Sequence, residues 1–455
     1  MRTQTPISYF RLSRRSLVAL SGAALLLTTT SGPRFLFAQE LEPSAFLAAD
    51  TVHDVSVEID PTTFEAMIEV YRQSEDKEWI SGTVTIDGTS YEQVGLRLKG
   101  NSSLRQLLGG EGPQGSVASG DVGPVALPWL IKLDEYVKDQ NHDGMEQLVI
   151  RSNNSQTSMN EAVALNLLDM AGLASQQAAA VRFSVNGSDS WLRLAIENPK
   201  GKWMRAHFPE DGTLFKSEAE GDWSYRGDNY EDYYKIAFDL EAGGTGDDAA
   251  DFVPLMEFMD FLNNADDETF LAELPARLDI ESFATYLSMM GLIGNSDDID
   301  GPGNNSYLYW NWETEQFTVV PWDMNLAFGG FQAMGQSAGD GQTPDGFPGD
   351  TGQQPPQGDM GRGERSNQGT PGMPDGNGGF GGGNNPLVSR FTANTDWAGL
   401  IDATTTELRG SLFVSGDATS ILENWTTLLT EQATDLVTVE TIESEAATIA
   451  AFFEG

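Results

Sequence analysis

Several residue types are scarce in this chain, and each shortage excludes a class of function. Cysteine is absent from the 455 residues, so disulfides, thiol nucleophiles and zinc sites built on cysteine are excluded. Only three histidines occur, which makes a Ser-His-Asp hydrolase a poor fit. Basic residues are also few, because 26 Lys and Arg stand against 68 Asp and Glu, and the formal net charge is −42. Such a surface repels nucleic-acid phosphates and anionic lipids, so we expect no nucleic-acid partner and no peripheral membrane binding.

Long apolar runs are missing after the first 38 residues, and these 38 differ from the rest. They contain five arginines and no acidic residue, and Arg14 and Arg15 lead into an apolar stretch at 17–27. This pattern is typical of a twin-arginine signal peptide, with a cleavage point after Ala38. The stretch is shorter than the ~20 residues that a membrane span needs. We therefore expect export by the twin-arginine route, no stable membrane span after removal of the signal, and an extracellular, periplasmic or cell-surface location.

The pattern of apolar residues changes along the chain from strand-like to helical. Alternation and short apolar runs predict a β-rich N-lobe over residues 39–200, with helices at 61–71 and 158–171 and strands near 52–60, 82–88, 94–99, 129–133, 148–152, 181–185 and 192–196. Helical spacing over 252–294 predicts a mostly helical C-lobe over 201–328, which resumes at 386–455. Between its parts, residues 329–385 contain 19 glycines and 6 prolines, a composition that predicts a disordered insertion. The expected fold class is α+β, with two lobes.

The densest polar segment is a loop at 295–305, followed by two short predicted strands at 306–310 and 316–321. Asp300 and Asn305 are five positions apart in this loop, and Asp323 follows the second strand. Protein kinases place a catalytic Asp, a magnesium-binding Asn and a second metal-binding Asp in this way. The alternative is a loop of Asx turns with solvated carboxylates. Calcium loops fit less well, because Glu is missing at the twelfth position both here and in the Asp-Gly turn at 139–144.

Basic residues are candidates for phosphate binding because this chain has so few of them. Lys132 lies on an apolar strand, where it either reaches nucleotide phosphates between the lobes or faces solvent. Arg97 and Lys99 precede a turn with Asn101 and Ser102, whose backbone N–H groups suit a phosphate cradle, although no Walker A pattern is present.

Two carboxylates could complete such a site. Glu161 lies near the start of the helix at 158–171, where it either pairs with Lys132, as in kinases, or forms a capping box with Ser158. Glu197 is a lesser candidate, as a hydrogen-bonding group between the lobes. Lys216 is expected to be a surface lysine.

Taken together, these segments resemble the CotH kinase family of atypical kinase-like proteins. The resemblance covers about residues 52–430 and is carried, in order, by residues 94–103, 131–137, 159–172, 294–309, 320–329 and 385–391. The Pro-Trp-Asp segment at 321–323 is its most specific part. The resemblance implies a kinase-like fold that binds ATP and Mg²⁺ and phosphorylates Ser or Thr of extracytoplasmic or coat proteins.

The resemblance also implies a role for single residues. Lys132 would hold the α- and β-phosphates, Glu161 would orient Lys132, Asp300 would accept the proton of the substrate hydroxyl, and Asn305 with Asp323 would bind magnesium. The chain departs from the family pattern at residue 325, which is Asn where the family usually has Asp, and before the lysine strand, where a basic residue is missing.

We therefore interpret the chain as a secreted protein serine/threonine kinase with ATP and Mg²⁺ as cofactors and a protein substrate. The alternative is a non-catalytic, kinase-like surface or envelope protein that only binds. A third possibility is a calcium-stabilised adhesin. The pattern implies no particular oligomeric state.

Overall fold

A computed structural model describes residues 44–108, 123–329 and 385–454 of the chain, except residues 49, 209, 220 and 303. The predicted signal peptide at 1–38 lies outside the described residues, as does the predicted insertion at 329–385 apart from its two end residues. The elements described below belong to one compact unit.

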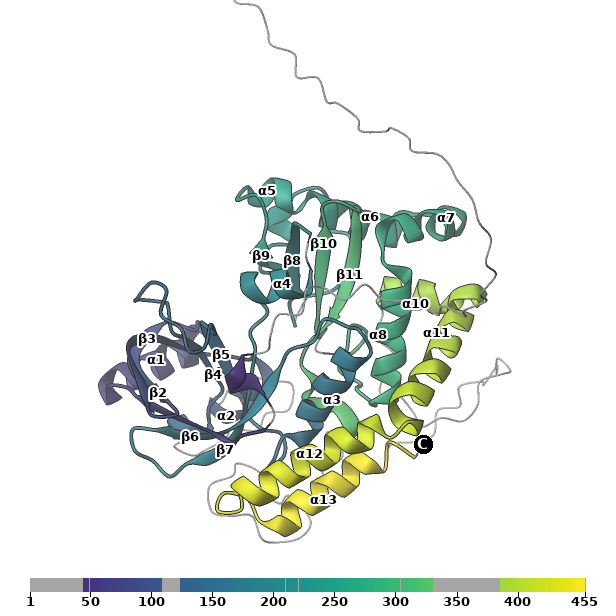
Figure 1. Ribbon diagram of the computed structural model, residues 1–455. Coiled ribbons are helices and arrows are strands. Elements are labelled where there is room, and N and C mark those ends of the chain that lie inside the picture. The colour runs from purple at the N-terminus through teal and green to yellow at the C-terminus, as the bar shows by residue number, and fades with distance from the viewer. Residues whose placement is uncertain are drawn as a thin grey trace, which may run out of the picture. The chain divides into compact units, whose positions relative to one another are not determined.

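The β-rich part is a closed barrel of seven strands in the order β1-β2-β3-β4-β5-β7-β6 (Figure 1). All neighbours are antiparallel except β1 and β6, whose parallel pairing closes the barrel. The strands are β1 (His53–Glu58), β2 (Ile80–Ile86), β3 (Thr89–Leu98), β4 (Trp129–Lys132), β5 (Gln147–Ile150), β6 (Ala178–Val185) and β7 (Trp191–Ile196). The strands predicted from apolar alternation are thus confirmed, whereas alternation did not predict that they close into a barrel.

The side chains of β3 and β4 pack into two different hydrophobic cores, one on each face of these strands. Leu96, Trp129 and Ile131 are fully buried in a core that the barrel strands form together with α1 (Pro61–Ser74) and α2 (Ser102–Leu108). Leu130 points to the other face and joins a second core, which continues into the C-terminal elements. Because successive side chains alternate, Arg97, which pairs with Leu130, shares this second face.

The C-terminal part is not only helical, because it begins with a four-stranded sheet in the order β11-β10-β8-β9. Its strands are β8 (Gly212–Ser217), β9 (Phe238–Gly243), β10 (Ser306–Asn311) and β11 (Gln316–Pro321). The β10–β11 hairpin confirms the predicted strand pair, and Ser306 pairs with Pro321 at its open end. The residues just before β10 and just after β11 therefore lie at the same end of the sheet.

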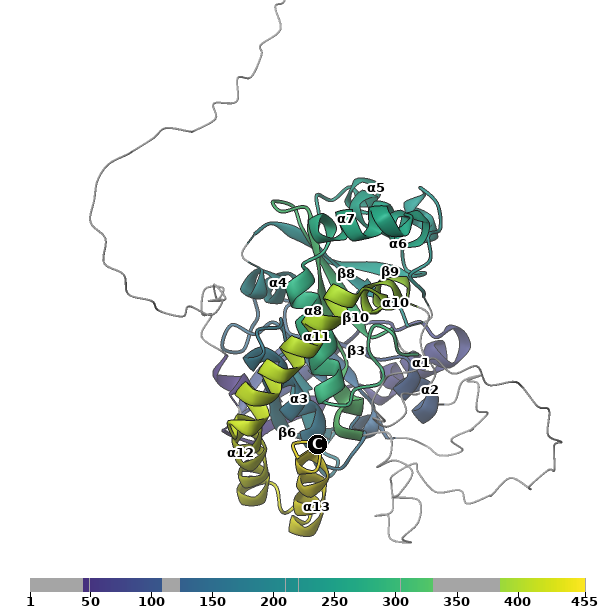
Figure 2. The same cartoon turned by 90° about the vertical axis from the view of Figure 1, so that its right-hand side faces the viewer.

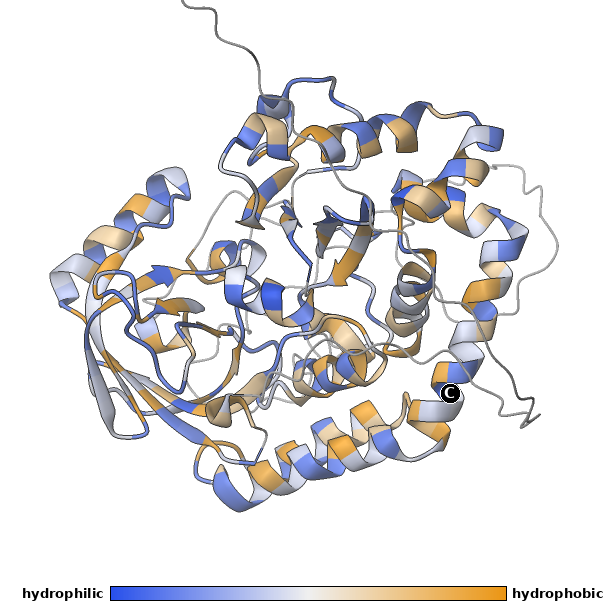
Figure 3. Ribbon diagram, turned by 45° about the horizontal axis from the view of Figure 1, so that its top comes forward, coloured by the Kyte–Doolittle hydropathy of each residue, from blue (hydrophilic) through white to orange (hydrophobic). Residues whose placement is uncertain are grey.

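Helices surround this sheet and one side of the barrel (Figure 2). The longer ones are α3 (Met159–Met170), α6 (Val253–Asn264), α7 (Asp267–Arg277), α8 (Ile280–Leu292), α11 (Thr395–Leu408), α12 (Asp417–Gln432) and α13 (Val439–Ala450). The shorter elements are α4 (Gly201–His207), α5 (Asp248–Asp251), α10 (Pro386–Ala393), η1 (Ala45–Leu47), η2 (Pro124–Ala126), η3 (Tyr230–Asp232), η4 (Met324–Gly329) and η5 (Arg409–Val414). The helices carry both hydrophilic and hydrophobic segments (Figure 3), as expected where one side of a helix is buried.

Helix α3 lies at the centre of the packing between the two parts. It comes after β5 in the chain and contacts η4, α12 and α13. Eight of its residues are at most 2% exposed, so its position is set by packing on several sides. The mixed α+β class with a β-rich region and many helices is confirmed.

Candidate active site

Basic side chains gather on the outer face of the barrel, toward the C-terminal sheet. Lys77 contacts Asn101, two residues after Lys99, and Lys99 contacts Asn198, two residues before Lys200. Burial and neighbouring positive charges lower the pKa values of Lys77, Lys99 and Lys200. They come from the loop before β2, from the end of β3, from the segment between β7 and α4, and from β8. The members are Lys77, Arg97, Lys99, Lys200 and Lys216. We call this group the cation cluster.

Burial and mutual repulsion perturb these groups strongly. Burial, with the charges of Lys216 and Arg97, lowers the pKa of Lys77 to about 8. Burial also lowers the pKa of Lys200 to about 8. The pKa of Lys99 lies well below its ordinary value, because this amine is buried and the neighbouring charges that act on it are positive. Gathering cations is unfavourable unless an anion joins them, so the cluster has the electrostatic character of an anion site.

Three members of the cluster have only neutral contacts among the described residues. Lys77 Nζ donates to Asn101 Oδ1 at 2.5 Å. Lys99 Nζ donates to Asn198 Oδ1 at 3.3 Å and lies 5.6 Å from the centre of the Trp322 ring. The Arg97 guanidinium stacks over Trp79 at 4.8 Å, and its buried Nε has no hydrogen-bond partner there.

The other two members carry carboxylate partners at the edge of the cluster. Lys216 Nζ contacts Glu218 at 3.2 Å, and Lys200 pairs with Glu241. Asp239 and Glu135 also interact electrostatically with Arg97, and Asp239 with Lys200 and Lys216, whereas only positive charges act on Lys99. An anion with several negative oxygens, such as a polyphosphate, suits the surroundings of Lys99.

A second charged group lies where β5, α3 and β11 meet. Arg151 follows β5, and its Nε donates to Glu161 Oε2 at 3.0 Å. Its Nη2 donates to Asp323 Oδ1, which is 172 positions further along the chain. One guanidinium therefore joins the first turn of α3 to a residue just after β11.

The energetics of this triad are those of a buried network. Burial alone would lower the pKa of Arg151, but the carboxylates of Asp323 and Glu161 raise it above its ordinary value. Burial and the nearby Asp323 raise the pKa of Glu161 to about 7, although Arg151 opposes the shift. Glu161 is only 2% exposed, and its Oε1 has no hydrogen-bond partner among the described residues. Glu161 is therefore tied to its place by Arg151.

Trp322 and Tyr307 connect the triad to the cation cluster. Trp322 lies under Lys99 and directly precedes Asp323, and its ring meets that of Tyr307 edge-on with centroids 5.4 Å apart. Tyr307 pairs with Lys216 across β10 and β8. Burial, Glu218 and Asp323 all raise the pKa of Tyr307, whose buried hydroxyl has no hydrogen-bond partner in the part of the chain that the structure describes. The cluster and the triad are thus two sides of one site.

The polar loop before β10 supplies two further side chains. Asn305 Nδ2 donates to the Asp297 carbonyl at 3.1 Å and to its Oδ2 at 3.0 Å. Because Ser306 pairs with Pro321, Asn305 and Asp323 flank the same end of the hairpin. Asp300 is held elsewhere, since its Oδ1 accepts the N–H of Asn385 at 3.1 Å, at the N-terminus of α10.

The predicted ion pair between Lys132 and Glu161 is wrong. Lys132 Nζ pairs with Glu135 Oε2 at 2.7 Å, in the turn that directly follows β4. The predicted capping box is also wrong, because Ser158 has a left-handed backbone (φ 54°) and makes no side-chain cap. Glu161 pairs with Arg151 instead, since an arginine from the adjacent strand end reaches the buried carboxylate.

Other predicted residues have defined local partners. Asn101 accepts the hydrogen bond of Lys77, and Ser102 begins α2. Glu197 Oε2 accepts the backbone N–H of Gln177 at 2.9 Å, and burial raises its pKa to about 7. Glu197 thus links the end of β7 to the segment before β6. Lys216, expected to be a surface lysine, is instead a member of the cation cluster.

The donor set at the hairpin end fits magnesium better than calcium. Asp323 and Asn305 offer carboxylate and amide oxygens, and Mg²⁺ commonly uses one or two such groups together with water and substrate phosphates. No group of three His, Cys, Asp or Glu side chains converges as metal ligands within the described residues. At 139–144 the Asn141 amide oxygen accepts the N–H of Gly144 at 3.0 Å, which is the geometry of a tight turn.

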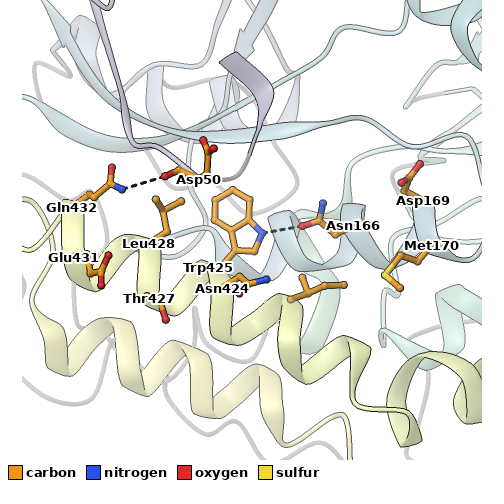
Figure 4. Close-up of a pocket in the computed structure, with 11 residues that line it drawn as sticks. Asp50, Asn166, Asp169, Met170, Asn424, Trp425, Thr427, Leu428, Glu431 and Gln432 are labelled. Carbon is orange, nitrogen blue, oxygen red and sulfur yellow. Dashed lines mark hydrogen bonds between the residues drawn. The ribbon is translucent and has the colours of Figure 1, made fainter. Parts of the chain in front are cut away.

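A pocket of about 570 Å³ lies elsewhere, between α3 and α12 (Figure 4). Trp425 in this pocket donates to Asn166 at 2.9 Å. Its lining includes carboxylates but no basic residue, which does not suit phosphate. The lining residues are Asp50, Asn166, Asp169, Met170, Ile421, Asn424, Trp425, Thr427, Leu428, Glu431 and Gln432.

Sequence reasoning missed Lys77, Lys200 and Arg151. None of them lies in a recognisable motif, and each reaches the site from a segment far away in the chain. The one available signal was their rarity, because in a chain with 26 basic residues a lysine or arginine beside an apolar strand is unusual.

Comparison with known proteins shows the family of the chain. The family model described as CotH kinase protein matches residues 126–447, which include Arg151, Glu161, Asp297, Asn305 and Asp323. No curated protein matches the chain. No helix among the described residues is long and apolar enough to cross a membrane. The matched region covers most of the sequence, and the chain belongs to the CotH kinase protein family.

Proposed function

We propose that this protein is an exported kinase that binds ATP with Mg²⁺ and transfers the γ-phosphoryl group to Ser or Thr of a protein outside the cytoplasm. The barrel takes the place of a kinase N-lobe, and the C-terminal sheet and helices that of the C-lobe. The observation that carries the proposal is the cation cluster, in which Lys77, Arg97 and Lys99 directly contact only neutral groups among the described residues, and in which positive charges surround the Lys99 amine. The twin-arginine motif at Arg14 and Arg15 supports export.

The cation cluster would hold the phosphates of the nucleotide. Lys77, Arg97 and Lys99 have neutral contacts and can turn their N–H groups to phosphate oxygens. Each such contact gains strength because burial has already removed water from the cation. Asp323 and Asn305 would hold Mg²⁺, which supplies neutralisation of phosphate charge during transfer.

Arg151 would set the geometry of the metal ligand. By pairing with both Glu161 and Asp323 it fixes the carboxylate of Asp323 relative to α3. The resemblance expected Lys132 to be the basic partner of Glu161, and here that partner is Arg151, at the end of β5. Lys132, engaged by Glu135, stays at the rim.

Asp297 is the better candidate for the general base. The amide of Asn305 donates to both its carbonyl and its carboxylate, so Asp297 lies beside a proposed metal ligand. In the proposed step, the carboxylate takes the proton as the substrate oxygen forms a bond to the γ-phosphorus, and the bond from this phosphorus to the bridging oxygen of ADP breaks. Asp300, which accepts an N–H from Asn385, is the rival for this role.

The test measures binding and transfer separately on the exported form of the chain. Calorimetry should show saturable ATP binding that Mg²⁺ strengthens, and labelled ATP should phosphorylate a casein-like protein or the chain itself. Binding without transfer would identify the alternative, a non-catalytic kinase-like binding protein. Absence of ATP binding at millimolar nucleotide, with and without Mg²⁺, would refute the proposal.

A further inference from the structure

The C-terminal helix α13 makes polar contact with the start of α3. Glu445 Oε1 accepts the backbone N–H of Gln156 at 2.8 Å. Glu445 Oε2 accepts the N–H of Thr157 at 3.1 Å, the Ser155 hydroxyl at 2.9 Å, and the Thr157 hydroxyl. One carboxylate thus receives four donors from three consecutive residues that lie nearly 290 positions away.

Two of these donor hydroxyls also accept hydrogen bonds from the N–H groups at the start of α3. The Ser155 hydroxyl also accepts the N–H of Ser158 at 3.0 Å, and the Thr157 hydroxyl accepts the N–H of Met159 at 3.2 Å. Ser158 offers no side-chain cap of its own. Ser155 and Thr157 therefore cap the start of α3, and Glu445 holds both of these hydroxyls in place and adds a negative charge near the N-terminus of the helix, which suits the helix dipole.

The turn that follows α13 reaches two further parts of the site. Phe452 and Phe453 each meet the ring of Phe328 in η4, with centroids 5.8 Å apart. Phe452 also packs so closely on Gly294 that a Cβ on this glycine would lie 2.8 Å from its ring. Gly294 begins the loop that carries Asp297, and η4 directly follows Asp323.

Helix α3 and η4 are also joined to each other. Asn160 Nδ2 donates to the carbonyl of Asn325 at 2.7 Å, and Phe328 N–H donates to the carbonyl of Ile293 at 2.6 Å. Glu161 follows Asn160 directly, so a shift of the α3 terminus moves Glu161 relative to Asp323.

We infer that α13 is a positioning element of the active site. Glu445 holds the segment that caps α3, and Phe452 and Phe453, in the turn after α13, hold η4 and the start of the Asp297 loop. This helix and the turn after it thus set the three segments that carry Glu161, Asp323 and Asp297. Glu445 is a positioning residue, because it acts on the site only through these segments. The catalytic part of this inference rests on the proposed function.

The first experiment compares Glu445→Gln with Glu443→Gln. Both variants remove one negative charge from α13, but the Glu443 side chain is exposed. In Glu445→Gln, an amide NH₂ group replaces an oxygen that accepts from N–H and hydroxyl donors. We expect turnover to fall ~10- to 100-fold, as misplaced catalytic groups do, with magnesium-free ATP affinity within about 2-fold of the parent. Glu443→Gln should keep both values. Equal turnover in the two variants would overturn the inference.

The second experiment does not depend on activity. Amide hydrogen exchange should become faster in residues 155–162 and 324–329 of Glu445→Gln, and in residues 324–329 and 294–298 of Phe452→Ala, but unchanged in Glu443→Gln. If the parent protein neither binds ATP nor transfers phosphate, the proposed function fails, and these exchange rates alone decide the positioning role. Unchanged exchange in both Glu445→Gln and Phe452→Ala would refute it.

Discussion

Replacing Lys99 by Met should weaken ATP binding while leaving the fold at least as stable as before. Lys99 carries a buried amine that contacts the Asn198 amide oxygen and the Trp322 ring. Burial and the charges of Lys216, Lys200, Arg97 and Lys77 lower its pKa well below the ordinary value. In the nucleotide-free protein this charge opposes folding, and methionine of similar length removes it.

The expected loss of affinity follows from the value of a charged hydrogen bond. A hydrogen bond to a charged group contributes about 1.5–3 kcal/mol, so losing one contact to phosphate should raise the Kd for ATP by ~10- to 150-fold. Lys202→Met is the matched control, because Lys202 lies on α4 close in sequence to Lys200 but pairs with Glu146 at the surface. An exposed pair of this kind contributes at most about 1 kcal/mol, and it lies outside the cluster.

Calorimetric titration with ATP and thermal unfolding without nucleotide would be measured on the parent and both variants. Lys99→Met should show weaker binding and an equal or higher midpoint of unfolding, whereas Lys202→Met should bind ATP as the parent does. A Lys99→Met protein that binds ATP normally but unfolds at a lower temperature would show that Lys99 is a structural residue. The assignment of the cation cluster to phosphate would then be wrong.

Three further predictions concern charge and chemistry at the site. The pKa values of Lys77 and Lys200 are about 8 in the folded protein, below their ordinary value, so the unfolded chain binds more protons above pH 8. The nucleotide-free protein should therefore gain stability as pH rises from about 8 toward 10, which denaturant titrations would detect. ATP affinity should fall over the same range, because the two lysines lose their charge, and calorimetry would measure this loss. Arg151→Met leaves the buried Glu161 without its cation and should cost about 3–5 kcal/mol at neutral pH. Burial raises the pKa of Glu161 to about 7 in the parent, and this pKa should rise further in the variant. The stability of the variant should therefore recover as pH falls from 7 toward 5, because Glu161 becomes neutral. A loss of stability relative to the parent that stays constant over this range would contradict the pairing. Asp297→Asn should lower turnover by ~100-fold or more with ATP affinity retained, and Asp300→Asn should have the smaller effect on turnover; the opposite order would assign the base to Asp300.

Local patterns were sufficient for most elements of the fold. Alternating apolar residues predict β1 to β7, and the spacing of apolar residues predicts α1, α3 and α8, because these signals arise from neighbours within a few positions. The β10–β11 hairpin with Asn305 and Asp323 at one end is likewise local, since strand pairing follows from a short turn. The charged residues on the outer face of β3 also follow from alternation.

The partners of the site residues could not be predicted in this way. Lys132 and Glu161 both occupy the predicted elements, yet Lys132 pairs with Glu135 three positions away, and Glu161 pairs with Arg151. A cation reaches a buried carboxylate only if its side chain points toward that carboxylate and is buried to the same depth. The spacing of motifs in the sequence contains no information on either property.

Composition and spacing by themselves determined the mixed α+β class of the fold, its main strands and helices, and the presence of a kinase-like Asp and Asn pattern around a hairpin. Only the tertiary structure decided that the strands close into a barrel, that five cations meet on its outer face, and that Arg151 joins the end of β5 to α3 and to the end of β11. It also decided that Glu445 binds the segment before α3, nearly 290 positions earlier. The physical reason is that these contacts join distant segments whose approach is set by the packing of two shared cores. Such packing is a property of the whole chain, whereas alternation, capping and turn signals are properties of a few neighbouring residues.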